Sequence, residues 1–274
     1  MSVTNRPRHA FERGRPGPGM DVDIGFEFEG RTAVVTGGSR GIGRAIAEGF
    51  AEAGADVVPL ARSESALEDV VRAVRERGVE SSLETVDVTR SDEVEACFER
   101  VADDLGVDVV VNNAGVNPDA ALGPPGAVSD EGFQQVVDVN LQGAFACARA
   151  AESALTASEG VLINVASVGG LVGLPRQHPY VASKHGLVGL TRSLALDWAP
   201  DVRVNCLAPG YVATDLTEEL RSDEALRRSI EERTPLERFA DPGEIASPAV
   251  FLASGMASYA TGATLAVDGG WTAR

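Results

Sequence analysis

The sequence predicts an α/β protein in which a doubly wound, parallel sheet lies between two layers of helices. Short apolar runs typical of buried strands alternate with longer segments of helical periodicity between residues 31 and 267. A glycine-rich turn joins the first apolar run to the first helical segment, as in nucleotide-binding βαβ units. Because no linker interrupts this alternation, we expect a three-layer sandwich with about seven strands.

Each predicted element follows from local spacing. Ile42, Ile46 and Phe50 repeat at helical intervals, and Gly54 ends that helix. The predicted strands are 32–36, 55–61, 79–86, 107–112, 161–166, 202–207 and 264–267. The predicted helices are 42–53, a charged stretch ending at Gly78, 91–105, 129–156, 180–199, a region near 215–232, and 242–254. Pro59 is a misfit, because proline removes a hydrogen-bond donor from a strand that should be internal.

The first residues differ in composition from the rest. Residues 1–25 hold four arginines among Pro and Gly without apolar periodicity, so we expect a disordered tail there. Residues 26–274 are expected to form a single domain. Met20 is an alternative start of the protein, which leaves open whether residues 1–19 belong to it.

The formal net charge of −17, from 41 acidic and 24 basic residues, argues against a nucleic-acid partner. No apolar run has the length of a membrane span, and no secretory signal is evident. The three cysteines have no paired spacing and the three histidines no metal-ligand spacing, so we expect a cytoplasmic protein without a bound metal. Lys184 is the one lysine in the chain. An acidic surface with so little lysine indicates a salt-rich cytoplasm, or else a GC-rich genome that prefers arginine codons.

The turn after the first strand reads Thr36-Gly37-Gly38-Ser39-Arg40-Gly41-Ile42-Gly43. Glycines here permit a tight turn, approach of the backbone to a pyrophosphate, and close packing of helix on strand. A strand-to-helix turn is sometimes glycine-rich merely to turn, but the βαβ context favours a dinucleotide site. The spacing T-G-x-x-x-G-x-G resembles that of the short-chain dehydrogenase/reductase family, whose fold is Rossmann-like.

The resemblance implies a set of cofactor contacts, most of them at carboxyl ends of strands, where open α/β sheets bind ligands. They are Gly37, Ser39, Gly41, Ile42 and Gly43 in the turn, Asp87 and Val88, then Asn113, Ala114 and Gly115 of the N-N-A-G segment, then Tyr180 and Lys184, and finally Pro209, Gly210, Val212 and Thr214.

The choice between NADP(H) and NAD(H) depends on the end of the second strand. NAD sites usually carry an acid about 20 residues after the glycine turn, whereas this chain has Arg62 there. Arg40 and Arg62 together suit a 2′-phosphate, which predicts NADP(H). The alternative is that both arginines are solvated and that Glu64 takes the ribose, which leaves NAD(H) possible.

Tyr180 and Lys184 stand at i and i+4 of a predicted helix, so they share a face. A nearby ammonium, together with the positive nicotinamide of an oxidised cofactor, is expected to lower the pKa of the phenol from about 10 and so suit it to acid–base work. Asn140 faces the apolar side of its helix, where a buried amide needs partners. With Ser167, these residues fill the four catalytic positions of the resembling family. Both residues also have a simpler structural interpretation. Asn140 would make a hydrogen bond that bends its helix, and Ser167 would belong to a polar turn.

The resemblance implies hydride transfer between the nicotinamide and a secondary alcohol or ketone. Tyr180 would move the proton, and Ser167 would orient the oxygen. The C-terminal stretch, with Arg233-Thr234-Pro235-Leu236 and then Ala260-Thr261-Gly262, is similar to that of sugar- and aldonate-oxidising members and of 3-oxoacyl-carrier-protein reductases. We favour a sugar-derived hydroxy or keto acid for two reasons. The segments 116–125, 168–179 and 211–233 are expected to hold no arginine cluster for a carrier group, and the side chains of Asn117, Asp119, Gln177 and His178 suit hydrogen bonds to a polyol. The family usually forms homotetramers. A non-catalytic NADP-binding sensor on the same fold is the alternative of another class.

The salt hypothesis predicts that the melting temperature rises as KCl is raised from about 0.1 M to about 1 M, because the Debye length falls from about 10 Å to about 3 Å and repulsion between surface carboxylates weakens. Calorimetry at a series of KCl concentrations measures this. A melting temperature that stays level or falls would favour codon preference as the source of the composition.

Overall fold

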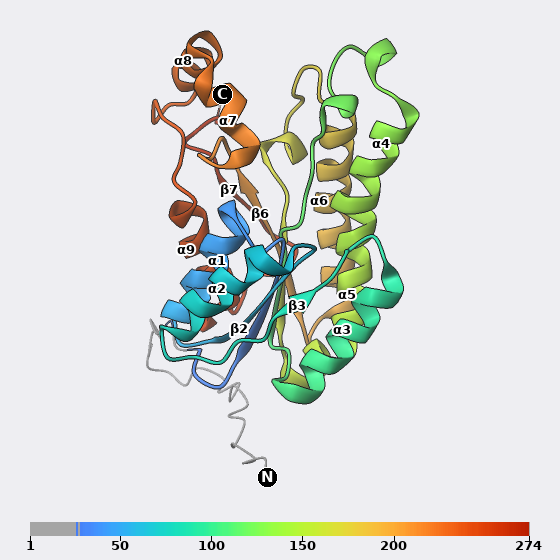
Figure 1. Ribbon diagram of the computed structural model, residues 1–274, viewed down its shortest axis with the longest axis vertical. Coiled ribbons are helices and arrows are strands. Elements are labelled where there is room, and N and C mark those ends of the chain that lie inside the picture. Colours follow the sequence, from blue (N-terminus) through green and yellow to red (C-terminus); the bar gives the residue numbers. More distant parts are fainter. Residues whose placement is uncertain (1–25, 27, 274) are drawn as a thin grey trace.

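Seven short strands, most of them apolar, form one parallel sheet in the computed structural model, which describes residue 26 and residues 28–273 (Figure 1). The strand order is β3-β2-β1-β4-β5-β6-β7. The strands are β1 Thr32–Thr36, β2 Asp56–Ala61, β3 Glu84–Thr85, β4 Val109–Asn112, β5 Val161–Val165, β6 Arg203–Pro209 and β7 Thr264–Val267. The predicted fold class is therefore confirmed. The predicted tail over residues 1–25 lies outside the described residues.

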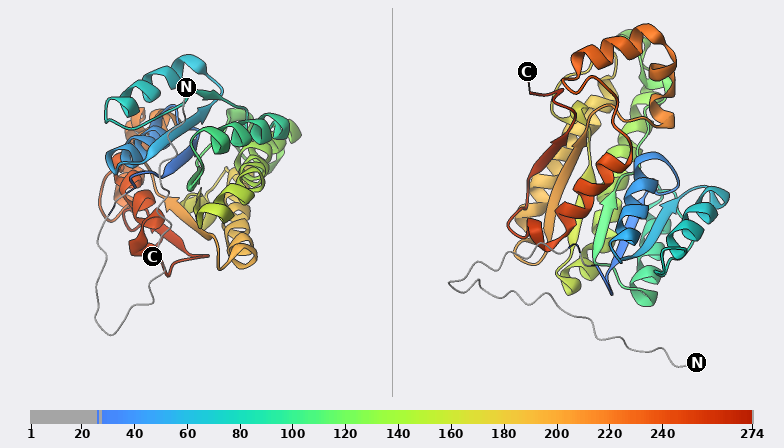
Figure 2. Two further views of the ribbon diagram at one scale, coloured as in Figure 1. Left: turned by 90° about the horizontal axis from the view of Figure 1, so that it is seen from below. Right: turned by 90° about the vertical axis from the view of Figure 1, so that its left-hand side faces the viewer.

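Helices cover both faces of the sheet (Figure 1). The helices are α1 Gly41–Glu52, α2 Glu64–Arg75, α3 Ser91–Asp104, α4 Asp130–Val137, α5 Gly143–Ser158, α6 His178–Trp198, α7 Glu218–Ser222, α8 Glu224–Arg233 and α9 Gly243–Ala253. Neighbouring strand residues point to opposite faces, so Val35 packs among α1 and α9 while Val34 packs among α3 and α5. None of the helices in the described part of the chain is long and apolar enough to cross a membrane. Figure 2 shows α7 and α8 beyond one end of the strands.

The second and third strands depart from the prediction. The strand predicted over 79–86 is reduced to Glu84–Thr85, which pair with Leu60 and Ala61 only. This explains Pro59. Val57 donates to the carbonyl of Glu80 and Ala61 accepts from Val86, so the odd-numbered residues of β2 face β3. Pro59 faces the gap before β3 begins, and its missing N–H costs no ladder bond.

Two predicted helices are interrupted. The helix predicted over 129–156 contains a π-helical turn, Asp138–Gln142, between α4 and α5. The helical region near 215–232 is a 3₁₀ turn, Asp215–Thr217, followed by α7 and α8. Asp223 separates the last two, since its carboxylate accepts hydrogen bonds from the backbone N–H groups of Ala225 and Leu226 and so begins a new helix.

The turn between β1 and α1 depends on glycines for two reasons. Gly37 and Gly41 have φ angles of 64° and 53°, a left-handed region that other residues rarely adopt. Gly43 lies outside that region, but a Cβ there would stand 2.2 Å from the carbonyl oxygen of Gly37 and 2.4 Å from Nδ2 of Asn113. The start of α1 therefore packs directly on the turn and on the residue after β4.

We predict that Gly43→Ala lowers the free energy of unfolding by about 1–3 kcal/mol, because the added methyl group meets rigid backbone. Gly243→Ala is the matched control, since Gly243 also stands in the first turn of a helix and no atom lies within 4 Å of the position that its added methyl group would take. Urea unfolding of both variants measures the effect. Equal stabilities would contradict the close packing at Gly43.

Candidate functional site

The candidate site lies at the carboxyl edge of the sheet, where the strand order reverses between β1 and β4. Open α/β sheets bind ligands at this point. Hydrogen bonds tie the two strand ends together here. The backbone N–H groups of Asn113 and Ala114 both donate to Oγ1 of Thr36 at 3.0 Å, and Nδ2 of Asn113 donates to the carbonyls of Thr36 and Gly37.

The N-terminus of α1 opens onto this edge without a side-chain cap. Arg40, at the N-cap position, makes no capping hydrogen bond, and the first turn of α1 holds no acidic residue. Ser129 caps α4 and Asp223 caps α8, whereas the other described α-helices begin without a side-chain cap, and α1 is the one of these that begins at the glycine turn. The free N–H groups and the helix dipole at α1 suit an anionic group such as a pyrophosphate. Ser39 is half-buried in the turn, and Ile42 packs against the core.

The segment after β6 closes over the glycine turn. A Cβ built on Gly41 would lie 3.2 Å from Cγ2 of Thr214, and Val212 is buried and bridges to Ala240. Pro209 ends β6, and a Cβ on Gly210 would meet Cα of Asp268 at 2.8 Å. The structure thus brings the predicted residues 209–214 next to the predicted turn.

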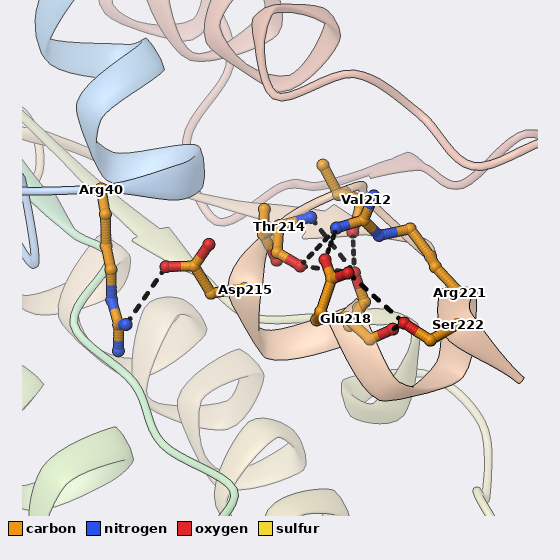
Figure 3. A network of polar contacts seen from close by, with 8 residues as sticks. Arg40, Val212, Thr214, Asp215, Glu218, Arg221 and Ser222 are labelled. Carbon is orange, nitrogen blue, oxygen red and sulfur yellow. Dashed lines mark hydrogen bonds and ion pairs between the residues drawn. The ribbon is translucent and has the colours of Figure 1, made fainter.

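The two arginines predicted to hold a 2′-phosphate lie on neighbouring elements. Nη1 of Arg40 donates to Oδ2 of Asp215 at 3.2 Å, and both side chains are more than 70 % exposed (Figure 3). Such an exposed pair contributes little stability. Arg62 is exposed after the end of β2, and its charge acts on Asp87.

Asp87 is held in place by Thr89. Burial raises the pKa of Asp87, but hydrogen bonds from the backbone and hydroxyl of Thr89, with the charge of Arg62, hold that pKa below its usual value. Val88, next to it, packs into the core beneath Gly143. The third predicted segment therefore presents a carboxylate beside the arginine proposed to select the cofactor.

Tyr180 and Lys184 lie on one face of α6, as their spacing predicts. Nζ of Lys184 stands 5.7 Å from the centroid of the Tyr180 ring and donates to the carbonyl of Val165 at 2.8 Å. Lys184 is buried, and Tyr180 is half-buried. The last residue of β5 thus anchors the ammonium group beneath the tyrosine.

Burial decides the protonation behaviour of this pair. It lowers the pKa of Lys184 to about 8, because the charged ammonium loses solvation. It also raises the pKa of Tyr180, and the hydroxyl of Ser167 offsets this only in part. In the chain alone, burial therefore raises the pKa of Tyr180. The predicted lowering also depends on the positive charge of an oxidised nicotinamide, so it stays a prediction for the protein with cofactor bound.

Asn140 sits in the π-helical turn, with 1 % of its surface exposed. Its Oδ1 accepts from the backbone N–H of Val116 at 2.8 Å, while Nδ2 donates to the carbonyl of Val116 and to Oγ of Ser183. A Cβ built on Gly115 would lie 3.4 Å from Oδ1 of Asn140 and 3.5 Å from Nζ of Lys184. The amide and the ammonium therefore converge on one glycine.

Ser167 begins the 3₁₀ turn Val168–Gly170 that follows β5. It is buried, and its Oγ accepts from the backbone N–H of Gly169 at 3.1 Å. A Cβ on Gly169 would touch the ring of Tyr180 at 3.3 Å, so this turn packs against the tyrosine. The four residues singled out from the sequence are thus brought to one place, although residues up to 44 positions apart supply them.

Two further features border the site: Asn117 and Gln177, which the sequence analysis expects to hydrogen-bond a polyol substrate, and Tyr211, which was not predicted as a site residue. Oδ1 of Asn117 is buried and accepts no hydrogen bond from the described residues, while its Nδ2 donates to Gln177. Tyr211 acts electrostatically on Tyr180. Its position directly after Pro209-Gly210 was a usable signal in the sequence. No group of three or more metal-ligating side chains exists within the described residues.

Comparison with known proteins gives a consistent picture. A family model described as Enoyl-(Acyl carrier protein) reductase matches residues 37–272. A 3-oxoacyl-[acyl-carrier-protein] reductase of Staphylococcus epidermidis is 40 % identical over 244 residues, which cover 88 % of this chain and 98 % of the relative. The 2-dehydro-3-deoxy-D-gluconate 5-dehydrogenase of Escherichia coli is 37 % identical over 254 residues, 91 % of this chain and 98 % of the relative.

Solved structures agree with the fold. A gluconate 5-dehydrogenase from Burkholderia cenocepacia, in complex with NADP and tartrate, matches with a TM-score of 0.87 and 34 % identity over 91 % of this chain and 98 % of that one. A short-chain type dehydrogenase/reductase from Mycobacterium marinum matches with a TM-score of 0.85 and 35 % identity over the same shares.

The buried ammonium predicts a pH-dependent stability. Between pH 8 and the ordinary value of 10.5, folded Lys184 has lost its proton while unfolded Lys184 keeps it. The unfolded chain then binds more protons, so the free energy of unfolding rises with pH by up to about 1.4 kcal/mol per unit from this group. Lys184→Met removes the contribution. Urea unfolding at several pH values should show the free energy of unfolding of the wild type rising relative to that of Lys184→Met above pH 8. A difference between the two free energies that stays constant with pH would refute the lowered pKa.

Proposed function

Since the chain belongs to the short-chain dehydrogenase/reductase family, it is an oxidoreductase of CH–OH and keto groups, and we propose that it transfers a hydride between NADP(H) and a sugar-derived hydroxy or keto acid. The observation that carries the proposal is the convergence of Tyr180, Lys184 and Asn140 beside the open N-terminus of α1. Acid–base groups and an anion-binding turn on one sheet edge suit a dinucleotide-dependent reaction.

The residues present fit the cofactor. Gly37, Gly41 and Gly43 keep side chains out of the turn, and the N–H groups at the start of α1 lack a side-chain acceptor. When bound, the nicotinamide supplies the hydride acceptor or donor. Asn113, Ala114 and Gly115 would flank the adenosine side, with Asp87 and Val88, and Pro209, Gly210, Val212 and Thr214 the nicotinamide side.

Each catalytic residue has a distinct task in this proposal. Tyr180 moves the proton to or from the substrate oxygen, and Ser167 orients that oxygen. Lys184 places a positive charge beneath the phenol and favours its ionised form. Asn140 holds the backbone at Val116 and faces Gly115 together with Lys184, which supports a water relay between the two. The positive charge of an oxidised nicotinamide would lower the pKa of Tyr180 that burial raises.

NADP(H) is favoured over NAD(H) by charge. Arg40 and Arg62 stand at the turn and at the end of β2, where an NAD site carries an acid. The Burkholderia relative was crystallised with NADP. A guanidinium offers planar, bidentate hydrogen bonds to a phosphate. To bind one, Arg40 would give up only its exposed ion pair with Asp215, which contributes little stability. NAD(H) remains the second cofactor to be tested.

A polar substrate is favoured by Asn117. Its buried Oδ1 accepts from no donor in the part of the chain that the structure describes, and an unpaired buried acceptor costs about 1–3 kcal/mol. A substrate hydroxyl would satisfy it, with Gln177 beside it. Gluconate-oxidising relatives agree with a polyhydroxy acid of carbohydrate metabolism. The second candidate is a 3-oxoacyl thioester, because the staphylococcal relative reduces that group on a carrier protein and is 40 % identical.

Exposed apolar groups support a homotetramer built on α5 and α6. Phe145 on α5 is 44 % exposed and Leu196 on α6 is 82 % exposed. Gly189 on α6 has nothing within 4 Å of a built Cβ, so this face is open to another helix.

Three free, buried cysteines suit a reducing cytoplasm. The acidic composition supports adaptation to high salt.

Absorbance at 340 nm, with a panel of sugar acids, neutral sugars and 3-oxoacyl thioesters, tests the proposal with both cofactors. We expect sugar acids to be turned over with NADP(H) preferred, and Tyr180→Phe to lower kcat by about 10²–10⁴-fold because the proton donor is lost. Tyr259→Phe is the matched control, since Tyr259 is fully exposed.

Other outcomes separate the alternatives. Turnover of thioesters alone would replace the sugar acid by the second candidate. Binding of NADP(H) without turnover of any substrate would indicate the non-catalytic sensor. Full activity in Tyr180→Phe would refute the assignment of the proton donor.

A further inference from the structure

Arg233 differs from the other arginines of its region. The segment 211–233 does hold arginines, contrary to the expectation of no arginine cluster there, but most of them have partners. Four arginines of the region each form an ion pair with a glutamate: Arg221, Arg227, Arg228 and Arg238. Arg233, at the end of α8, makes no ion pair with any described residue, although the chain holds 41 acidic residues. Its guanidinium instead lies 4.4 Å from the centroid of the Trp271 ring. A guanidinium stacked on a ring keeps its N–H edge available to a planar anion.

Trp271 belongs to an aromatic and apolar cluster that borders the site. It is buried with Val168 and Ile230, and its ring centroid lies 4.8 Å from that of Tyr211. Val168 directly follows Ser167, and the same turn touches the ring of Tyr180 through Gly169. The cluster thus connects the end of α8 with the turn that follows Ser167 and packs against Tyr180.

Tyr211 links the arginine to the proposed proton donor. Burial raises the pKa of Tyr211, and the charge of Arg233 lowers it in part. Tyr211 in turn contributes to the raised pKa of Tyr180. Its side chain is therefore close enough to feel the guanidinium on one side and to influence Tyr180 on the other, while Phe239 packs edge-on against its ring.

We propose that Arg233, stacked on Trp271, and the hydroxyl of Tyr211 bind the carboxylate of the substrate and so determine specificity for acids. This rests on the proposed function, because it assigns the charged end of the proposed sugar acid. A net charge of −17 repels an anion, so selective binding requires a cation at short range. A charge-assisted, bidentate contact from one unpaired guanidinium suits one carboxylate. A thioester offers no such group.

The chain provides its own reporter for the test. It has two tryptophans, and Trp198 lies at the far end of α6, so Trp198→Phe leaves Trp271 as the sole indole. We would add Tyr180→Phe to this background to suppress turnover, titrate the NADP⁺-loaded protein with D-gluconate and with its uncharged amide, and follow Trp271 fluorescence. Arg233→Gln should raise the Kd for gluconate by about 10–100-fold, the effect of a charged hydrogen bond, and hardly change that for the amide.

Two further variants sharpen the result. Tyr211→Phe should weaken gluconate binding by a smaller factor, since a neutral hydrogen bond is lost. Arg228→Gln is the matched control, because Arg228 stands on the same helix and pairs with Glu224, and it should bind gluconate as the parent does.

Equal gluconate affinity in the parent and Arg233→Gln, or equal affinity of the parent for gluconate and its amide, would overturn the inference even if sugar acids are turned over. Conversely, Arg233-dependent binding of gluconate without turnover of any sugar acid would support the carboxylate site and overturn the proposed substrate. The two hypotheses therefore fail in different experiments.

Discussion

The burial of one ammonium group is the constraint on which the site depends. Lys184 is 3 % exposed, and its Nζ has the carbonyl of Val165 as its hydrogen-bond partner at 2.8 Å. Removing such a charge from water is costly unless nearby dipoles compensate. The end of β5 therefore has to stand at a fixed distance from α6. The same geometry holds the ring of Tyr180 over the ammonium and leaves Gly115 as the floor between Lys184 and Asn140.

Hydrogen bonds to the backbone hold the glycine turn, the proposed cofactor half of the site, in a fixed position as well. Asn113 spans from the end of β4 to the carbonyls of the glycine turn, and Thr36 accepts two N–H groups from across the switch point. Gly43 allows that contact, since any side chain there would displace the amide. The turn and the tyrosine helix are thus held to the same strands, so the proposed cofactor and proton donor share one rigid reference.

Local spacing predicted what local forces decide. The sequence indicated β1 and β7 with their observed bounds, and placed Tyr180 and Lys184 on one face. It overestimated β3, because Pro59 of β2 has no N–H to donate toward that strand, and the two strands pair only at Leu60 and Ala61. It marked Asn140 as core-facing but not the π-helical turn that carries it, since one extra residue hardly alters an apolar pattern.

The remaining misses arise from tertiary contacts and desolvation. The direction of the Tyr180 pKa depends on how deeply the ring is buried, which spacing does not reveal. Tyr211, Arg233 and Trp271 are separated by up to 60 residues and meet only in the fold.

The contact of Arg233 with Trp271 also matters for how so acidic a protein binds anions. The proposed ligands, a dinucleotide and a sugar acid, are both anions approaching a protein of net charge −17. High salt screens that long-range repulsion far more than it screens a contact between touching groups, so an acidic surface remains compatible with anion binding through a few arginines in direct contact.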